Sequence, residues 1–175
     1  LATTHHPLLE AISLLSEELL LEQIVLLSEA LQSDWGLVTP QIAICGLNPH
    51  ASDDGLFGDE EAMILSPAIK RGREMGTNVT GPFPADTVFY RALTGNFDAI
   101  IAPYHDVGMA AFKTAAFGRG VNVTLGLPFV RTSPDHGTAF DIAGTSSADA
   151  TSMVEAVRLA IYLTQNRFSK SFLHD

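Results

Sequence analysis

Three histidines that lie far apart in the chain are the residues best suited to binding a metal ion. They occur in the strings Thr3-Thr4-His5, Asn48-Pro49-His50 and Tyr104-His105-Asp106, each of which resembles the end of a β-strand followed by a loop. Because an α/β fold gathers its chemistry outside the carboxyl ends of parallel strands, three imidazoles from three strands can form a divalent metal site with open positions for substrate. The spacing leaves a second interpretation open, in which these histidines are surface or hydrogen-bonded structural groups.

A second group of residues is typical of anion binding. Arg119, Asn122 and Arg131 lie in the glycine-punctuated segment 118–132. An arginine matches phosphate or carboxylate oxygens in a bidentate way, and an asparagine can donate to a hydroxyl or phosphate oxygen. The alternative is that the glycines serve turns and both arginines cover the surface. The sequence contains no P-loop and no Gly-x-Gly-x-x-Gly string, so it does not support a Rossmann-type nucleotide site.

Three further residues are candidates for catalysis. Lys113 lies eight residues beyond His105, two turns along a predicted helix, so both side chains can face one crevice. A lysine beside a metal can act as a general acid or base. Asp106 and Asp86 can orient a ligating histidine or bind the metal directly. The alternatives are a solvated lysine and, for Asp86, an ordinary helix N-cap.

Alternating strands and helices must position these residues. Buried strands are predicted at 41–45, 78–80, 98–102 and 121–125, and helices at 16–32, 60–75, 85–93, 107–116 and 147–165. Ser16 and Asp59 are the predicted caps of the first two helices, and Gly76 is predicted to end the second. Two prolines predict a loop at 81–84, and the polar tail 166–175 is predicted to fray. The alternation specifies an α/β fold with a mainly parallel sheet.

Composition excludes several classes of function. The 175 residues carry a formal net charge of −10, which argues against a nucleic-acid or acidic-membrane partner. No apolar run approaches the ~20 residues of a membrane span. The lone Cys45 excludes an internal disulfide framework, is typical of a reducing, cytoplasmic compartment, and is predicted to be a small core residue. The chain opens on Leu1 rather than Met, so we expect a piece of a longer protein.

The most specific string in the chain is Asp135-His136-Gly137-Thr138-Ala139-Phe140-Asp141-Ile142-Ala143-Gly144. It resembles the adenine-side loop of the isocitrate and isopropylmalate dehydrogenase superfamily, whose enzymes hold NAD without a Rossmann motif. Within that superfamily the chain resembles the 4-hydroxythreonine-4-phosphate dehydrogenases of pyridoxal phosphate biosynthesis. The strings that carry this resemblance follow the family's order: Thr3-Thr4-His5, Cys45-Gly46-Leu47-Asn48-Pro49-His50-Ala51, Gly81-Pro82-Phe83-Pro84-Ala85-Asp86-Thr87, Tyr104-His105-Asp106 and the segment 117–132.

The resemblance implies a three-layer α/β fold like that of isocitrate and isopropylmalate dehydrogenases, with a mainly parallel sheet, of which this is a partial chain. Residues 1–127 would form most of the metal- and substrate-binding, dimer-forming domain. Residues 128–175 would be the return segment of the nucleotide-binding domain.

The resemblance also implies roles for individual residues. The implied metal ligands are His5, His50 and His105, the implied substrate contacts are Lys113, Asn122 and Arg131, and the cofactor loop is His136, Gly137, Thr138, Ala139 and Asp141. The implied enzyme is a homodimer with shared active sites, in which His105 completes the metal site of the partner chain.

The implied reaction is the oxidation of a secondary alcohol in a phosphorylated hydroxy acid by NAD or NADP. A divalent ion such as zinc, cobalt, magnesium or manganese would polarise the hydroxyl and stabilise the developing negative charge. The resulting β-keto acid then loses carbon dioxide.

Two local departures from the family pattern bear on the substrate. Ser52-Asp53-Asp54 is more acidic than the glycine-rich loop usual after the second histidine, and Val107 replaces a usual glutamine. These changes favour, as an alternative substrate, a related four-carbon acid such as a threonate or erythronate phosphate.

Family chains are nearly twice as long, and the absent half contains part of the substrate and nucleotide sites. We therefore expect this chain to lack activity when alone. A competing hypothesis is a non-catalytic remnant that keeps the dimer interface and the metal site.

Overall fold

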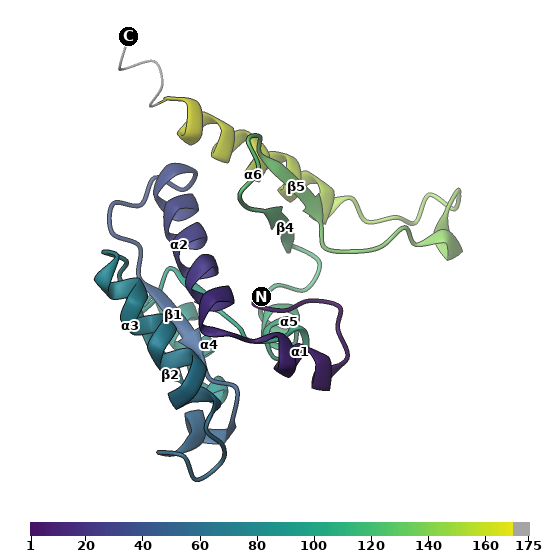
Figure 1. Cartoon of the computed structure of the whole chain (residues 1–175). Coiled ribbons are helices and arrows are strands. Elements are labelled where there is room, and N and C mark those ends of the chain that lie inside the picture. The colour runs from purple at the N-terminus through teal and green to yellow at the C-terminus, as the bar shows by residue number, and fades with distance from the viewer. Residues whose placement is uncertain (170–175) are drawn as a thin grey trace. The chain divides into compact units, whose positions relative to one another are not determined.

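The computed structural model describes residues 1–169, and they form two compact units (Figure 1). The first unit contains residues 1–32 and 37–111, and the second contains residues 33–36 and, among the described residues, 112–169. No helix among the described residues is long and apolar enough to cross a membrane. The assignment of 1–127 and 128–175 to two domains of a longer fold stays a prediction.

The first unit is built on a three-stranded parallel sheet. Its strands are β1 (Ile42–Cys45), β2 (Val79–Phe83) and β3 (Ala99–Ile101), in the order β2-β1-β3. All four residues of β1 are buried, which is the pattern of a central parallel strand covered on both faces. The predicted α/β fold with a parallel sheet is confirmed.

The helices of this unit mostly fall where periodicity predicts them. They are α1 (Leu8–Leu14), α2 (Glu17–Ser33), η1 (Pro49–Ser52), η2 (Glu61–Leu65), α3 (Ser66–Glu74), α4 (Ala85–Leu93) and α5 (His105–Ala116). The last residue of α2 and residues 112–116 of α5 belong to the second unit. The predicted cap of α2 is confirmed, because the Leu19 N–H donates to Ser16 Oγ over 3.1 Å. Gly76 ends α3 with a φ of 87°, whereas α1 is an element that the sequence pattern did not indicate.

The helices cover both faces of the sheet. Ala43 and Cys45 of β1 pack with Val88 of α4, and alternation along the strand turns Ile42 and Ile44 to the opposite face. Figure 1 draws α2 and α3 alongside this sheet. Burial, reinforced by the negative charge of Glu61, raises the pKa of the Cys45 thiol to about 12, so the prediction of an unreactive core cysteine is confirmed.

The prediction of a loop at 81–84 is wrong in part, because β2 runs through the glycine and the first proline to Phe83. A proline cannot donate to a strand ladder, and it is tolerated here because β2 is an edge strand. The Gly81–Pro82 peptide bond is cis. The register with β1 shifts between Ala43 and Cys45, as expected for a β-bulge.

The second unit is an antiparallel hairpin packed on a helix. The hairpin joins β4 (Val121–Thr124) to β5 (Arg131–Pro134), and a short 3-10 helix, η3 (Phe140–Ile142), precedes α6 (Thr151–Ser169). Thr132 Oγ1 donates to the Ala156 carbonyl of α6 over 2.9 Å. The helix begins later than predicted and continues through residues 166–169, where fraying was expected; the rest of that tail lies outside the described residues.

Candidate functional site

The chain start lies beside the end of β3 and brings two of the three candidate histidines together. The backbone N–H groups of Ala2 and Thr3 donate to the carbonyls of Ala102 (2.7 Å) and Pro103 (3.2 Å). Thr3 Oγ1 also donates to the Pro103 carbonyl over 3.0 Å. This pairing follows β3 beyond its last residue and places the His5 and His105 rings 5.6 Å apart, centroid to centroid.

The two imidazoles line a small polar depression with a volume of about 110 Å³. Its walls are Thr3, Thr4, His5, His6, Leu8, Ala11, Tyr104, His105 and Asp106. The Asp106 carboxylate lies 2.7 Å from Nδ1 of His105, which leaves Nε2 of that ring available to a ligand. A carboxylate behind an imidazole is the usual way to orient a metal-binding histidine, so the chemistry of these residues fits a divalent metal ion.

His50 is presented by a different, tightly held loop. Residues 50–54 all have positive φ values between 47° and 70°, a left-handed turn that is unfavourable for residues other than glycine. The buried carboxylate of Glu61 supports this turn by accepting the N–H groups of Leu47 (2.8 Å) and Asn48 (2.7 Å) and the Asn48 amide (2.8 Å). A buried carboxylate thus holds the segment that precedes His50 in place.

The structure therefore joins His5 to His105 and leaves His50 apart from them. Within residues 1–169 of a single chain, no group of three His, Cys, Asp or Glu side chains lies close enough to hold a metal ion. A three-histidine site, completed by a ligand from a second subunit, stays a prediction.

The hairpin of the second unit presents two predicted substrate contacts on one face. Asn122 of β4 is opposite Ser133 of β5, and Thr124 is opposite Arg131. Since opposite residues and residues two apart share a face, Asn122 and Arg131 are diagonal neighbours. Arg131 Nη1 donates to Thr124 Oγ1 over 2.8 Å. Both predicted contacts are exposed, so this face can meet an anion.

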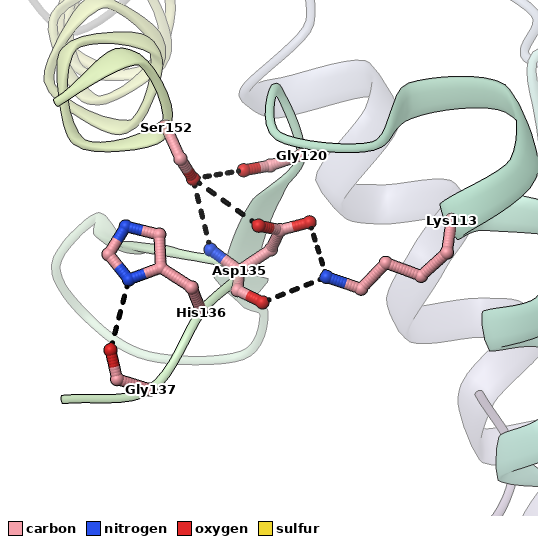
Figure 2. Close-up of polar contacts among 6 residues, drawn as sticks. All are labelled: Lys113, Gly120, Asp135, His136, Gly137 and Ser152. Atoms are coloured by element: carbon pink, nitrogen blue, oxygen red, sulfur yellow. Dashed lines mark hydrogen bonds and ion pairs between the residues drawn. The ribbon is translucent and has the colours of Figure 1, made fainter. Parts of the chain in front are cut away.

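Lys113, the third predicted substrate contact, reaches the end of the same hairpin (Figure 2). Its Nζ donates to Asp135 Oδ2 over 2.8 Å and to the Asp135 carbonyl over 3.0 Å. Asp135 lies two residues beyond Ser133, the register partner of Asn122. The hairpin region therefore carries a lysine, an arginine and an asparagine, which suits a phosphate or a carboxylate.

The other predicted site residues lie on exposed segments. Asp86 is in the first turn of α4 and is exposed. The predicted cofactor loop is also exposed; within it, His136 Nδ1 lies 3.0 Å from the Gly137 carbonyl, Ala139 has a φ of 45°, and Asp141 lies in η3. Thr138 lies between these residues and is likewise exposed.

Sequence reasoning missed three residues that hold the candidate groups in place. They are Glu61, Asp135 and Ser152. Asp135 is the first residue of the string that resembles the adenine-side loop, but its partner Lys113 lies 22 positions away, and no local pattern reveals such a pairing. Burial of Glu61, only 3% exposed, is equally invisible without the fold.

Solved structures of dehydrogenases share the fold of this chain, so the chain has a dehydrogenase-like α/β fold. It matches 4-hydroxythreonine-4-phosphate dehydrogenase from Klebsiella pneumoniae with a TM-score of 0.87 and 44% identity, over 94% of this chain and 49% of that one. It also matches a terephthalate 1,2-cis-dihydrodioldehydrogenase from Burkholderia xenovorans with a TM-score of 0.72 and 32% identity, over 91% and 50% of the two chains.

Residues 1–160 match the family described as "Pyridoxal phosphate biosynthetic protein PdxA", and the chain belongs to this family. A relative named 4-hydroxythreonine-4-phosphate dehydrogenase from Desulforapulum autotrophicum is 48% identical over 160 residues, or 91% of this chain and 47% of its own length. The protein of that name from Paracoccus denitrificans is 49% identical over 166 residues, or 94% and 51%. The chain thus spans about half the length of these relatives.

Proposed function

We propose that the protein carrying this chain oxidises 4-hydroxythreonine 4-phosphate with NAD in pyridoxal phosphate biosynthesis. Family membership supports an enzyme of this kind. The observation that carries the proposal for this chain is the hairpin region, where Lys113, Asn122 and Arg131 supply donors and positive charge to a phosphorylated acid. We infer that a homodimer with shared active sites acts in the cytoplasm, where the reduced state of the single cysteine would persist.

The three hairpin-region residues would bind and orient the substrate. The Arg131 guanidinium offers a planar pair of N–H donors to a phosphate or carboxylate, and the Asn122 amide can hold a hydroxyl or a phosphate oxygen. The Lys113 ammonium would meet a second anionic oxygen as a point charge. As carbon dioxide leaves the oxidised acid, the same ammonium can donate a proton to the resulting enolate.

A divalent metal ion would be held by His5, His50 and His105, with at least one imidazole supplied by a partner subunit. When bound, it would polarise the reacting hydroxyl and stabilise negative charge on oxygen. Asp106 would keep the His105 ring in one orientation. Asp86 is a candidate acceptor for the proton of the substrate hydroxyl, since its carboxylate is exposed at the start of α4.

NAD or NADP would contact the loop of His136, Gly137, Thr138, Ala139 and Asp141. Backbone N–H groups and small side chains allow a close approach of adenosine, and a carboxylate such as that of Asp141 can accept a hydrogen bond from a ribose hydroxyl. The cofactor would accept the hydride from the substrate carbon, while the protein's residues hold the two molecules in contact.

A related four-carbon substrate is the second candidate. The acidic, left-handed segment Ser52-Asp53-Asp54 directly follows His50, and Val107 lies two residues after His105. Extra negative charge near a metal ligand alters which anionic groups can approach it. These features favour threonate or erythronate phosphate as alternatives.

The test is NADH formation by the full-length encoded protein with 4-hydroxythreonine 4-phosphate, threonate 4-phosphate or erythronate 4-phosphate. We expect turnover with the first substrate and none from the 175-residue chain alone. Preference for either other acid would select the alternative substrate. No turnover with any of them, by protein that still binds metal, would favour the non-catalytic hypothesis.

Arg131→Ala should raise KM about tenfold to a hundredfold, because a charge-assisted bond is worth roughly 1.5–3 kcal/mol. The matched control is Arg158→Ala, since Arg158 is an exposed arginine of the same unit, paired only at the surface with Glu155. Equal KM values for the two variants would remove Arg131 from the substrate site.

A further inference from the structure

The Lys113 ammonium is clamped by a single acidic residue. Both the carboxylate and the carbonyl of Asp135 accept its N–H groups (Figure 2). The Asp135 side chain is only 7% exposed and that of Lys113 is 33% exposed. The carboxylate of this ion pair is therefore withdrawn from water, and its attraction for the ammonium is stronger than that between two fully exposed groups.

Asp135 is itself held by two other segments of the second unit. Its N–H donates to Ser152 Oγ over 3.1 Å, and that hydroxyl, buried in the first turn of α6, donates to the Gly120 carbonyl over 2.9 Å. A Cβ on Gly120 would collide with Phe112 Cζ and approach Asp135 Oδ2 to 2.5 Å, so a larger residue there would force these side chains to shift. The carboxylate consequently has little freedom to leave the lysine.

The aromatic surroundings of Lys113 restrict it further. Its Nζ lies 5.9 Å from the Phe112 ring centroid and 5.7 Å from that of Phe117, within the range of a cation–π attraction. An ammonium has three N–H donors. Two bonds to Asp135 leave the third N–H for an acceptor on a ligand. The ammonium is therefore held in one position and can donate one further hydrogen bond.

We propose that Asp135 is a positioning residue for Lys113, and that Ser152 holds Asp135 in that role. This inference rests on the proposed function, in which Lys113 meets the anionic substrate and donates a proton. Without the carboxylate, the flexible four-carbon stem of a lysine would sample several rotamers.

The first test measures the chemical reactivity of the Lys113 amine and does not depend on the substrate. The full-length protein is treated briefly with acetic anhydride, and acetylation of Lys113 is measured by peptide mass spectrometry against Lys70, which is 78% exposed. Asp135→Asn should raise the ratio severalfold, because the amine is no longer held against the carboxylate and becomes accessible to the reagent. Glu155→Gln, which removes another paired carboxylate of the same unit, should leave the ratio unchanged.

The second test separates positioning from a merely structural role. In the full-length enzyme, Asp135→Asn should lower kcat/KM about tenfold to a hundredfold, whereas in a Lys113→Met background the same change should have almost no further effect. Circular dichroism melting curves identify any variant that fails to fold, and for such a variant Ser152→Ala replaces Asp135→Asn in both tests, with a smaller effect in the same direction.

The outcomes are distinct. Faster Lys113 acetylation together with a loss that depends on Lys113 supports the proposal. Unchanged acetylation, or an equal loss of kcat/KM in both backgrounds, overturns it. Faster acetylation in a protein whose wild type turns over none of the substrates supports the clamp while refuting the proposed function.

Discussion

At the scale of single residues, two buried carboxylates each hold a separate part of the molecule. Asp34, 2% exposed, accepts bonds from the Arg167 guanidinium of α6 and from Ser33. Glu61 holds the segment that precedes His50. A buried acid that loses its hydrogen-bond donors destabilises the folded state. Substitutions in either group of contacts should therefore lower the free energy of unfolding.

Arg167→Met should destabilise the protein by about 3–5 kcal/mol at neutral pH, because it leaves a buried charge unpaired. Burial alone would raise the pKa of Asp34, but the hydrogen bonds from Arg167 and Ser33 and the charge of Arg167 outweigh it, so the pKa is lowered. A lowered pKa gives stability that is complete above the unfolded value near ~4 and is lost as the pH falls below it. The deficit of the variant should therefore shrink toward acidic pH in urea denaturation curves.

Arg158→Met is the control for this prediction, since its pair with Glu155 is exposed and should contribute less than about 1 kcal/mol. A deficit in Arg167→Met that stays constant from neutral to acidic pH would contradict the assignment to Asp34.

Glu61→Ala should cost about 2–4 kcal/mol, because three donors in the half-buried loop before His50 lose their buried acceptor. The measurement is the midpoint of urea unfolding. Glu74→Gln, at an exposed carboxylate 4.0 Å from Lys70, should change stability by less than about 0.5 kcal/mol. Similar small shifts for both variants would argue against Glu61 as the support of this loop.

At the scale of elements, the bulge in β2 predicts that the stability of the protein is sensitive to a side chain at Gly81. A Cβ at Gly81, where φ is 134°, would lie 2.7 Å from the Ile44 carbonyl oxygen, whereas a Cβ at Gly95, where φ is 87°, would meet nothing within 4 Å. Gly95→Ala should therefore cost only the conformational penalty of about 1 kcal/mol, and Gly81→Ala clearly more. Equal urea midpoints for these two variants would show that the close approach to β1 is not a constraint.

The elements also show which parts of the fold the sequence pattern can predict. The strand at 42–45 and the helices at 17–33 and 85–93 carry apolar periodicity and recognisable ends, and they were predicted to within a residue or two. β5 was missed because Arg131-Thr132-Ser133-Pro134 has no apolar residue with which to mark a buried face. Its stability comes from β4 and α6, partners that local patterns do not reveal.

The same limit applies to the candidate site. Residue type and resemblance selected Lys113, Asn122 and Arg131, and the structure gathers them around one hairpin. They did not select Asp135, because an ion pair between residues far apart in sequence depends on how the hairpin docks. Likewise, the contact between His5 and His105 depends on the pairing of the chain start with the end of β3.

At the scale of the whole molecule, the proposed metal site predicts a dimer whose subunits share ligands. A single chain brings His5 and His105 together within its described residues, and we propose that His50 joins them across a subunit interface. Co-expression of two different single-histidine variants tests this directly. If ligands are shared between subunits, at least one pair of variants should regain metal in mixed dimers, because one of the two sites is then intact; recovery in no pair would contradict sharing.

The most direct test of the central claim is the divalent metal content of the full-length protein, measured by inductively coupled plasma mass spectrometry after dialysis. We predict bound metal in the wild type and a sharp loss in each of His5→Ala, His50→Ala and His105→Ala. The control is Glu155→Ala, which removes an exposed carboxylate of α6 paired with Arg158, and it should leave the metal in place. Undiminished metal in all three candidate variants would contradict the assignment of these histidines to one site.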